Sequence, residues 1–106
     1  MKAIIWLSYD LGVRGDYEGL YAWLDDRKAK ECGDSVAYLE FEYKLDFLAE
    51  LRRSLQKAFV NSAKARIYVI HSVGKQSGAK GQWVIGGRKS PPWTGFGSSG
   101  REEVDQ

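Results

Sequence analysis

The sequence contains only one cysteine, one histidine and two prolines among its 106 residues. A lone cysteine, Cys32, excludes an internal disulfide and any metal site built from several cysteines, and we expect it near a helix end. No apolar run approaches the roughly 20 residues that a membrane-spanning helix needs. Residues 1–3 also lack the long apolar stretch of a secretory signal peptide, so we expect a cytoplasmic protein that makes no membrane contact.

A strong excess of charge of either sign is missing as well. Sixteen lysines and arginines against 14 aspartates and glutamates leave a net charge of +2. This balance excludes an acidic protein that imitates DNA, and it does not by itself establish a nucleic-acid partner. With 43% hydrophobic residues and a length of 106, the chain has the composition and size of one soluble globular domain.

Hydrophobic patterning in the first half of the chain predicts two strands around one helix. Residues 3–7 are apolar on both faces, which is typical of a central strand covered on each side. Asp16 is a suitable N-cap for a helix with apolar residues at helical spacing, and Gly33 suits the position after its end. Residues 35–43 then alternate between apolar and mixed positions, as a strand with one buried face does.

The second half of the chain predicts another helix and two more strands. Asp46 can cap a helix whose leucines form an apolar stripe, and residues 66–70 are rich in β-branched side chains. The glycines and lysines of residues 72–81 indicate a hairpin loop, and residues 82–85 a last strand. We expect an arm at 86–96, within a single domain of residues 1–96, and a disordered tail at 97–106.

The order β-α-β-α-β-β and the amphipathic strands predict an α/β (α+β) fold of the ferredoxin-like type. In this sandwich a four-stranded antiparallel sheet carries both helices on one face. The other face has no helix to cover it, so we expect it to meet a partner protein or a second copy of the chain.

The chain resembles the small CRISPR-adaptation subunit that pairs with the integrase, and the virulence-associated protein D toxins that share its fold. The resemblance lies in Tyr9-Asp10 at the end of the first strand, in Asp34-Ser35-Val36 at the second, and in residues 66–70 after a charged helix. It implies a ferredoxin-like homodimer that handles nucleic acid and acts as a small metal-dependent nuclease.

Asp10 is the first candidate for chemistry, because it lies where a strand meets a loop and matches the family's metal-ligand position. If two copies pack through their open sheet faces, two Asp10 carboxylates can hold Mg²⁺, which prefers carboxylate oxygens, water and phosphate. Asp10 would then be catalytic in phosphodiester cleavage. The alternative is a turn aspartate whose carboxylate accepts hydrogen bonds from loop amides.

The region from residue 75 to residue 96 combines cations with aromatic rings. Such a combination can bind a phosphate backbone or a single strand. It can equally dock on a protein, since Trp and Arg are favoured interface anchors, or Trp93 can fold back onto the core. The candidate residues for nucleic-acid or partner binding are Lys75, Lys80, Trp83, Arg88, Lys89 and Trp93.

Two hypotheses follow for the whole chain. The first is a dimeric nucleic-acid-handling protein, with Mg²⁺-dependent nuclease activity through Asp10. The second is a non-catalytic interaction module, for example an inhibitor or adaptor from a mobile element, that docks through its open sheet face or its Pro91-Pro92-Trp93 arm.

Overall fold

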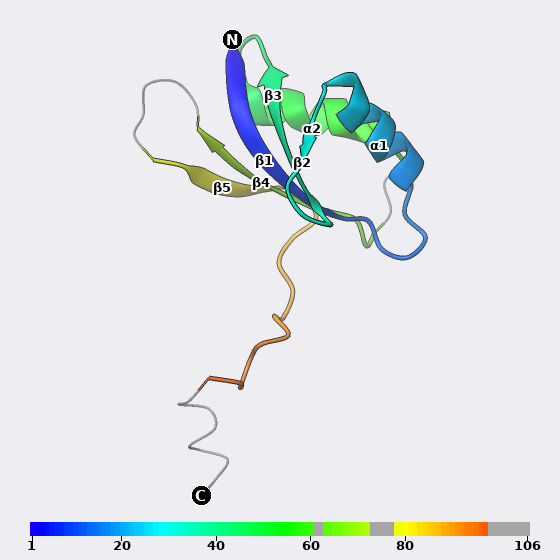
Figure 1. Ribbon diagram of the computed structural model, residues 1–106, viewed down its shortest axis with the longest axis vertical. Helices are drawn as coiled ribbons and strands as arrows, with labels where there is room; N and C mark the ends of the chain where they lie inside the picture. Colours follow the sequence, from blue (N-terminus) through cyan, green and yellow to red (C-terminus); the bar gives the residue numbers. More distant parts are fainter. Residues whose placement is uncertain (61–62, 73–77, 98–106) are drawn as a thin grey trace, which may run out of the picture.

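The computed structural model describes residues 1–60, 63–72 and 78–97, which form two helices and five strands (Figure 1). Along the chain these are β1 (Lys2–Asp10), α1 (Tyr17–Asp26), β2 (Lys30–Glu31), β3 (Val36–Glu42), α2 (Phe47–Ala58), β4 (Arg66–Ser72) and β5 (Lys80–Ile85). The strands join one sheet in the order β2-β3-β1-β4-β5, and every neighbouring pair is antiparallel. The predicted α+β class is confirmed, and the sheet has five strands rather than the predicted four.

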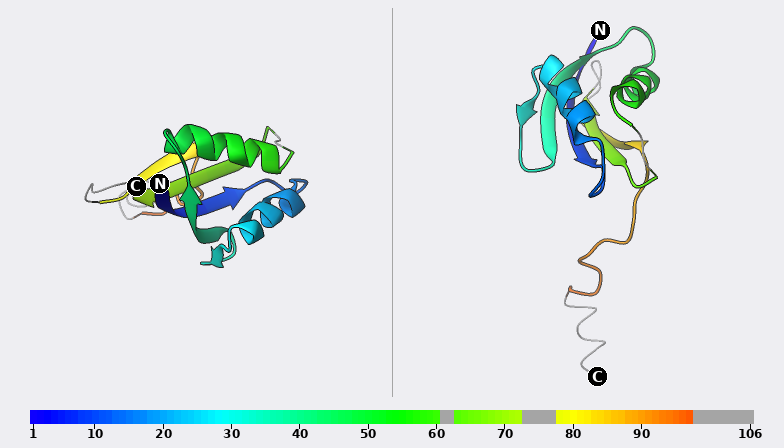
Figure 2. Two further views of the ribbon diagram at one scale, coloured as in Figure 1. Left: turned by 90° about the horizontal axis from the view of Figure 1, so that it is seen from above. Right: turned by 90° about the vertical axis from the view of Figure 1, so that its right-hand side faces the viewer.

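Both helices lie on the same face of the sheet (Figure 2). Alternate residues of the central strands point toward them and are fully or almost fully buried. Trp23 of α1 donates its indole N–H to Ser54 Oγ of α2 at 2.8 Å, which fixes one helix against the other. The largest fully buried side chains are Ile5, Leu7, Leu11, Leu20, Leu39, Leu51, Leu55, Ile67 and Val69.

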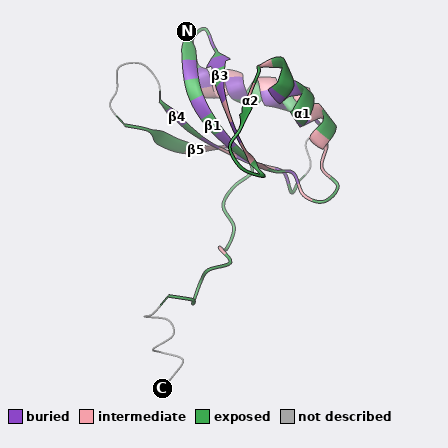
Figure 3. Cartoon of the chain, viewed as in Figure 1, coloured by how far each residue is buried: buried purple, intermediate pink, exposed green. Residues whose placement is uncertain are grey.

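Within the described part of the chain, the opposite face of the sheet carries no helix (Figure 2). On β1, exposed and buried residues alternate from Lys2 to Ser8 (Figure 3), and Ile4 and Trp6 each keep 39% of their surface exposed. The prediction that residues 3–7 are covered on both sides is therefore wrong, because both helices cover the same side. The prediction that no helix covers the other sheet face is confirmed for the residues that the structure describes.

The two predicted helix caps are both present. Asp16 Oδ1 accepts from the amide of Gly19 at 3.0 Å, and Asp46 Oδ1 accepts from the amide of Ala49 at 3.2 Å. Asp16 also accepts from the amide of Val60 through Oδ2, which ties the start of α1 to the end of α2. Among the described residues, no helix is long and apolar enough to cross a membrane.

The first helix ends earlier than the sequence predicts. Lys28 adopts φ +55°, and the amides of Lys28 and Ala29 donate to Asp25 O and Leu24 O, which is the Schellman motif that closes helices. A lysine in the position that usually belongs to glycine gives no sequence signal. The chain then forms the short β2, and Cys32 is exposed in the turn after β2 rather than at a helix end.

The arm leaves the sheet at Gly86, directly after β5. Gly86 has φ +72°, a left-handed conformation that an L side chain adopts only with strain. The arm runs away from the sheet (Figure 1) and then turns, since the amide and hydroxyl of Thr94 both donate to Pro91 O. The predicted arm at residues 86–96 therefore begins extended and ends in a tight turn.

Candidate functional site

Asp10, the last residue of β1, uses both of its carboxylate oxygens within the protein. Oδ1 accepts from the amide of Gly12 at 3.0 Å, and Oδ2 accepts from Nη2 of Arg66 at 3.1 Å. The Gly12 amide and, after it, the Arg66 guanidinium hold the pKa of the Asp10 carboxyl below its usual range. These are the contacts expected of a turn aspartate.

The surroundings of Asp10 in one chain do not fit a Mg²⁺ ion. Asp10 faces a hollow of about 460 Å³ whose charged lining is otherwise cationic, from Lys64, Arg66, Arg88 and Lys89. Mg²⁺ needs oxygen ligands, and no cluster of three or more His, Cys, Asp or Glu side chains suited to a metal occurs in the described part of the chain. The predicted Mg²⁺ site therefore depends on a second copy and stays a prediction.

The same cations line a second hollow beside the first. It has a volume of about 580 Å³ and lies between the end of the sheet and the arm. Arg66, Arg88 and Lys89 contribute to both hollows, whereas Trp83 and Trp93 line only the second. We call these five residues, Arg66, Trp83, Arg88, Lys89 and Trp93, the arm site. It brings three permanent positive charges and two large rings to one place.

A one-residue bulge in β5 positions Trp83. Trp83 pairs with Tyr68 on the open face, whereas Ile85 pairs with Ile67 on the helix face, so Val84 is the extra residue. Without the bulge, Ile85 would share the face of Trp83 and lie in water. The bulge thus keeps Ile85 in the core and leaves Trp83 beside the arm.

Arg66 and Tyr68 hold the Trp83 ring. The Arg66 guanidinium lies 5.7 Å from the ring centroid, a cation–π distance, and Tyr68 meets the ring edge-on at 5.0 Å. The indole N–H of Trp83 is buried and has no acceptor among the described residues.

Trp93 lies in the turn of the arm and keeps 72% of its surface exposed. Its neighbours Pro91 and Pro92 also line the second hollow, and proline restricts the backbone there. Of the three alternatives for this residue, folding back onto the core is not observed. Binding of nucleic acid and docking on a protein both remain compatible with its exposure.

The predicted binding residues divide into three groups. Trp83, Arg88, Lys89 and Trp93 meet at the arm site. Lys80 pairs with His71 on the helix face of the sheet, so it is not part of the arm site. Lys75 lies outside the residues that the structure describes.

Sequence reasoning missed Arg66 and Lys64 as members of the cationic group. The sequence pattern marks Arg66 only as the start of a strand. The antiparallel register of β1 and β4 sets it directly opposite Asp10. Pairing the end of the first predicted strand with the start of the third would have found this contact.

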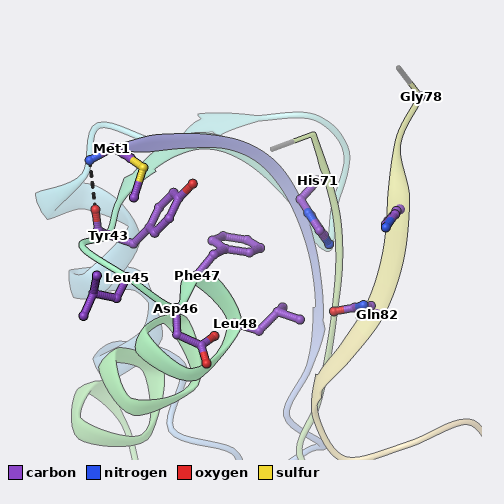
Figure 4. A pocket seen from close by; sticks show the side chains of 10 residues that line it. Met1, Tyr43, Leu45, Asp46, Phe47, Leu48, His71, Gly78 and Gln82 are labelled. Atoms are coloured by element: carbon purple, nitrogen blue, oxygen red, sulfur yellow. Dashed lines mark hydrogen bonds between the residues drawn. The ribbon is translucent and has the colours of Figure 1, made fainter. Parts of the chain in front are cut away.

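A third hollow, of about 440 Å³, surrounds His71 at the far end of β4 (Figure 4). His71 is buried against Phe47, with the ring centroids 4.8 Å apart. Neither ring nitrogen has a hydrogen-bond partner among the described residues, and burial, followed by the charge of Lys80, lowers the pKa of His71. Gln82 Oε1, which points toward His71 in Figure 4, also has no partner there.

Compared with known proteins, the chain has no significant match to any family model, curated protein or solved structure. The resemblance drawn from the sequence therefore stays a prediction, and the functional argument rests on the arm site itself.

Proposed function

We propose that the protein binds single-stranded nucleic acid at the arm site. The proposal rests on one observation: Arg66, Arg88 and Lys89 line the same hollow as Trp83 and Trp93. Arginine and lysine neutralise backbone phosphates, and exposed indole rings stack on bases of any sequence. Among the described residues, Asp10 is the only carboxylate that lines either hollow, and because it pairs with Arg66, the positive charge offered to phosphates comes mainly from Arg88 and Lys89.

A single strand suits this site better than a duplex does. Bases in a duplex are already stacked on one another, so Trp83 and Trp93 would have no ring faces to bind. In a single strand the bases are free to stack on aromatic side chains while the phosphates follow the cations.

The proposal is tested by the salt dependence of binding to a fluorescein-labelled oligouridylate or oligothymidylate, followed by anisotropy. For single strands, the slope of log K against log salt falls by about 0.7 for each phosphate contact. Arg88→Gln should weaken binding and make this slope shallower by about 0.7. Lys57→Gln, which removes an equal charge from the exposed side of α2, should change neither quantity.

Equal affinities and slopes for Arg88→Gln and the unchanged protein would contradict the proposal. In that case the exposed Trp93 and the rigid Pro91-Pro92 arm would favour the docking of a protein instead, because preorganised aromatic anchors suit such interfaces.

Cleavage by a ferredoxin-like homodimer that packs through the uncovered sheet face is an alternative proposal, which the resemblance and that face support. β3 and β4 both run antiparallel to β1 and flank it, with α2 connecting them on the core side. The nuclease hypothesis requires that Asp10→Ala abolishes Mg²⁺-dependent cleavage while the dimer persists. Cleavage that persists in this variant would remove Asp10 from the chemistry without affecting the binding proposal.

A further inference from the structure

Side chains on the open sheet face form two neighbouring rows that lead away from the arm site. The register sets the first row as Val36, Ser8, Tyr68 and Trp83, and the second as Tyr38, Trp6, Ile70 and Gly81. Three strand spacings separate β3 from β5, so each row is about 14 Å wide. We call the four rings Trp83, Tyr68, Trp6 and Tyr38 the aromatic track.

The rings of the track are held in pairs by the sheet. Trp6 and Tyr38 lie with their centroids 5.3 Å apart on adjacent strands. Tyr68, which contacts Trp83, leans across Gly81, where a Cβ atom would overlap the Tyr68 ring. Glycine at position 81 therefore lets this ring lie close to β5, and packing rather than solvent determines its orientation.

Charge along the open face runs from basic to acidic. Arg66, beside the arm, is at the basic end, whereas Glu40 and Glu42 lie at the other end, where Lys2 is within 4.0 Å of each. The aromatic track lies between the two ends. Lys30 of β2 pairs with Tyr38 and adds a cation at the outer edge of the track.

We infer that a single-stranded nucleic acid held at the arm site continues across the open sheet face and stacks bases on Trp6 and Tyr38. The inference rests on the proposed function and extends the binding site over the sheet. Phosphates follow the cations of the arm and of Lys30, and they avoid the carboxylates of Glu40 and Glu42. Aromatic residues on neighbouring strands of an uncovered sheet are a suitable platform for unpaired bases.

The test compares a dinucleotide, whose two bases can stack on Trp83 and Trp93, with an oligonucleotide of about ten nucleotides, a length within the usual range of single-strand sites. Both are measured as RNA and as DNA by competition anisotropy. Trp6→Ala and Tyr38→Ala should each weaken binding of the longer strand about tenfold, as loss of one stacked base does. Binding of the dinucleotide should not change in either variant.

Two controls separate this inference from the proposed function. Tyr21→Ala removes an exposed ring from α1, away from the track, and should leave both affinities unchanged. Arg88→Gln should weaken both oligonucleotides, because it acts at the arm site. Circular dichroism and thermal unfolding check that Trp6→Ala and Tyr38→Ala stay folded. Lys30→Gln, which removes a charge at the exposed edge of the sheet, is a second probe of the track and should also weaken binding of the longer strand.

The inference is overturned if the longer strand binds equally well to Trp6→Ala, Tyr38→Ala and Lys30→Gln. If Arg88→Gln still binds more weakly, the proposed function stands. If Arg88→Gln also leaves binding unchanged, both the inference and the proposed function are overturned. Sedimentation that shifts from dimer to monomer in Trp6→Ala would show that a second copy covers this face, which also overturns the inference.

Discussion

Among single residues, His71 is a titratable group whose charged form the fold opposes. It is buried, contacts Phe47, and lies near the cation of Lys80. The protein therefore favours a neutral imidazole, whereas the same ring in the unfolded chain is free to take up a proton. Because the folded and unfolded states bind the proton of His71 differently, the free energy of unfolding depends on pH.

The first prediction follows from the lowered pKa of His71. Because the unfolded chain binds the proton first, the free energy of unfolding should decrease as the pH falls below about 6.5, the ordinary pKa of histidine. The decrease should continue until the pH reaches the lower pKa of the folded state. Urea unfolding at a series of pH values across this range measures the effect.

His71→Leu is the control, because the chain has no other histidine. The variant should lose the decrease in this pH range and keep the acid unfolding that carboxylates cause at lower pH. A decrease of the same size in His71→Leu would show that another group is responsible.

Among the elements, β5 and the arm depend on one backbone position. Gly86, the first residue of the arm, has a positive φ of +72°. A Cβ atom there would also collide with the carbonyl oxygen of Ala65. The direction of the arm, and with it the place of Trp93 in the arm site, follows from this glycine.

The second prediction is that Gly86→Ala destabilises the protein by about 1–2 kcal/mol, the strain of a left-handed L residue. The variant should also bind the labelled oligonucleotide more weakly, because the arm must leave the sheet in another direction. Gly87→Ala is the matched control, since a Cβ at Gly87 meets no atom within 4 Å and its φ is not positive. Similar melting temperatures for the two variants would contradict this role of Gly86.

The elements also differ in how far the sequence predicts them. Both helix starts follow from Asp16 and Asp46, because a carboxylate that accepts first-turn amides is a local signal. The end of α1 does not follow from the sequence, because Lys28 adopts the left-handed conformation and lysine has no preference for it. The two residues of β2 are too few to show an alternating pattern, and the pairing with β3 alone makes them a strand.

At the scale of the whole molecule, the net charge of +2 conceals a separation of charge. Cations gather at the arm, and Glu40 and Glu42 lie at the opposite end of the open face. The composition therefore gives no sign of the local site. Only the register of the strands brings Arg66, Trp83 and the arm together.

The third prediction is that local charge, and not net charge, governs binding. Glu42→Gln raises the net charge from +2 to +3 but lies at the acidic end, away from the arm site. Because exposed charges farther apart than about 10 Å are screened at moderate salt, the salt slope of oligonucleotide binding should stay unchanged. A steeper slope in this variant would mean that the whole charge of the protein attracts the nucleic acid.

The bulge in β5 has one more consequence, for the behaviour of the protein at high concentration. β5 is an outer strand of the sheet, and the outward backbone groups of such a strand can pair with another chain. An extra residue in β5 bends and twists the strand, so a second, regular strand cannot align along its full length. The residue that positions Trp83 thereby also protects the sheet against edge-to-edge aggregation.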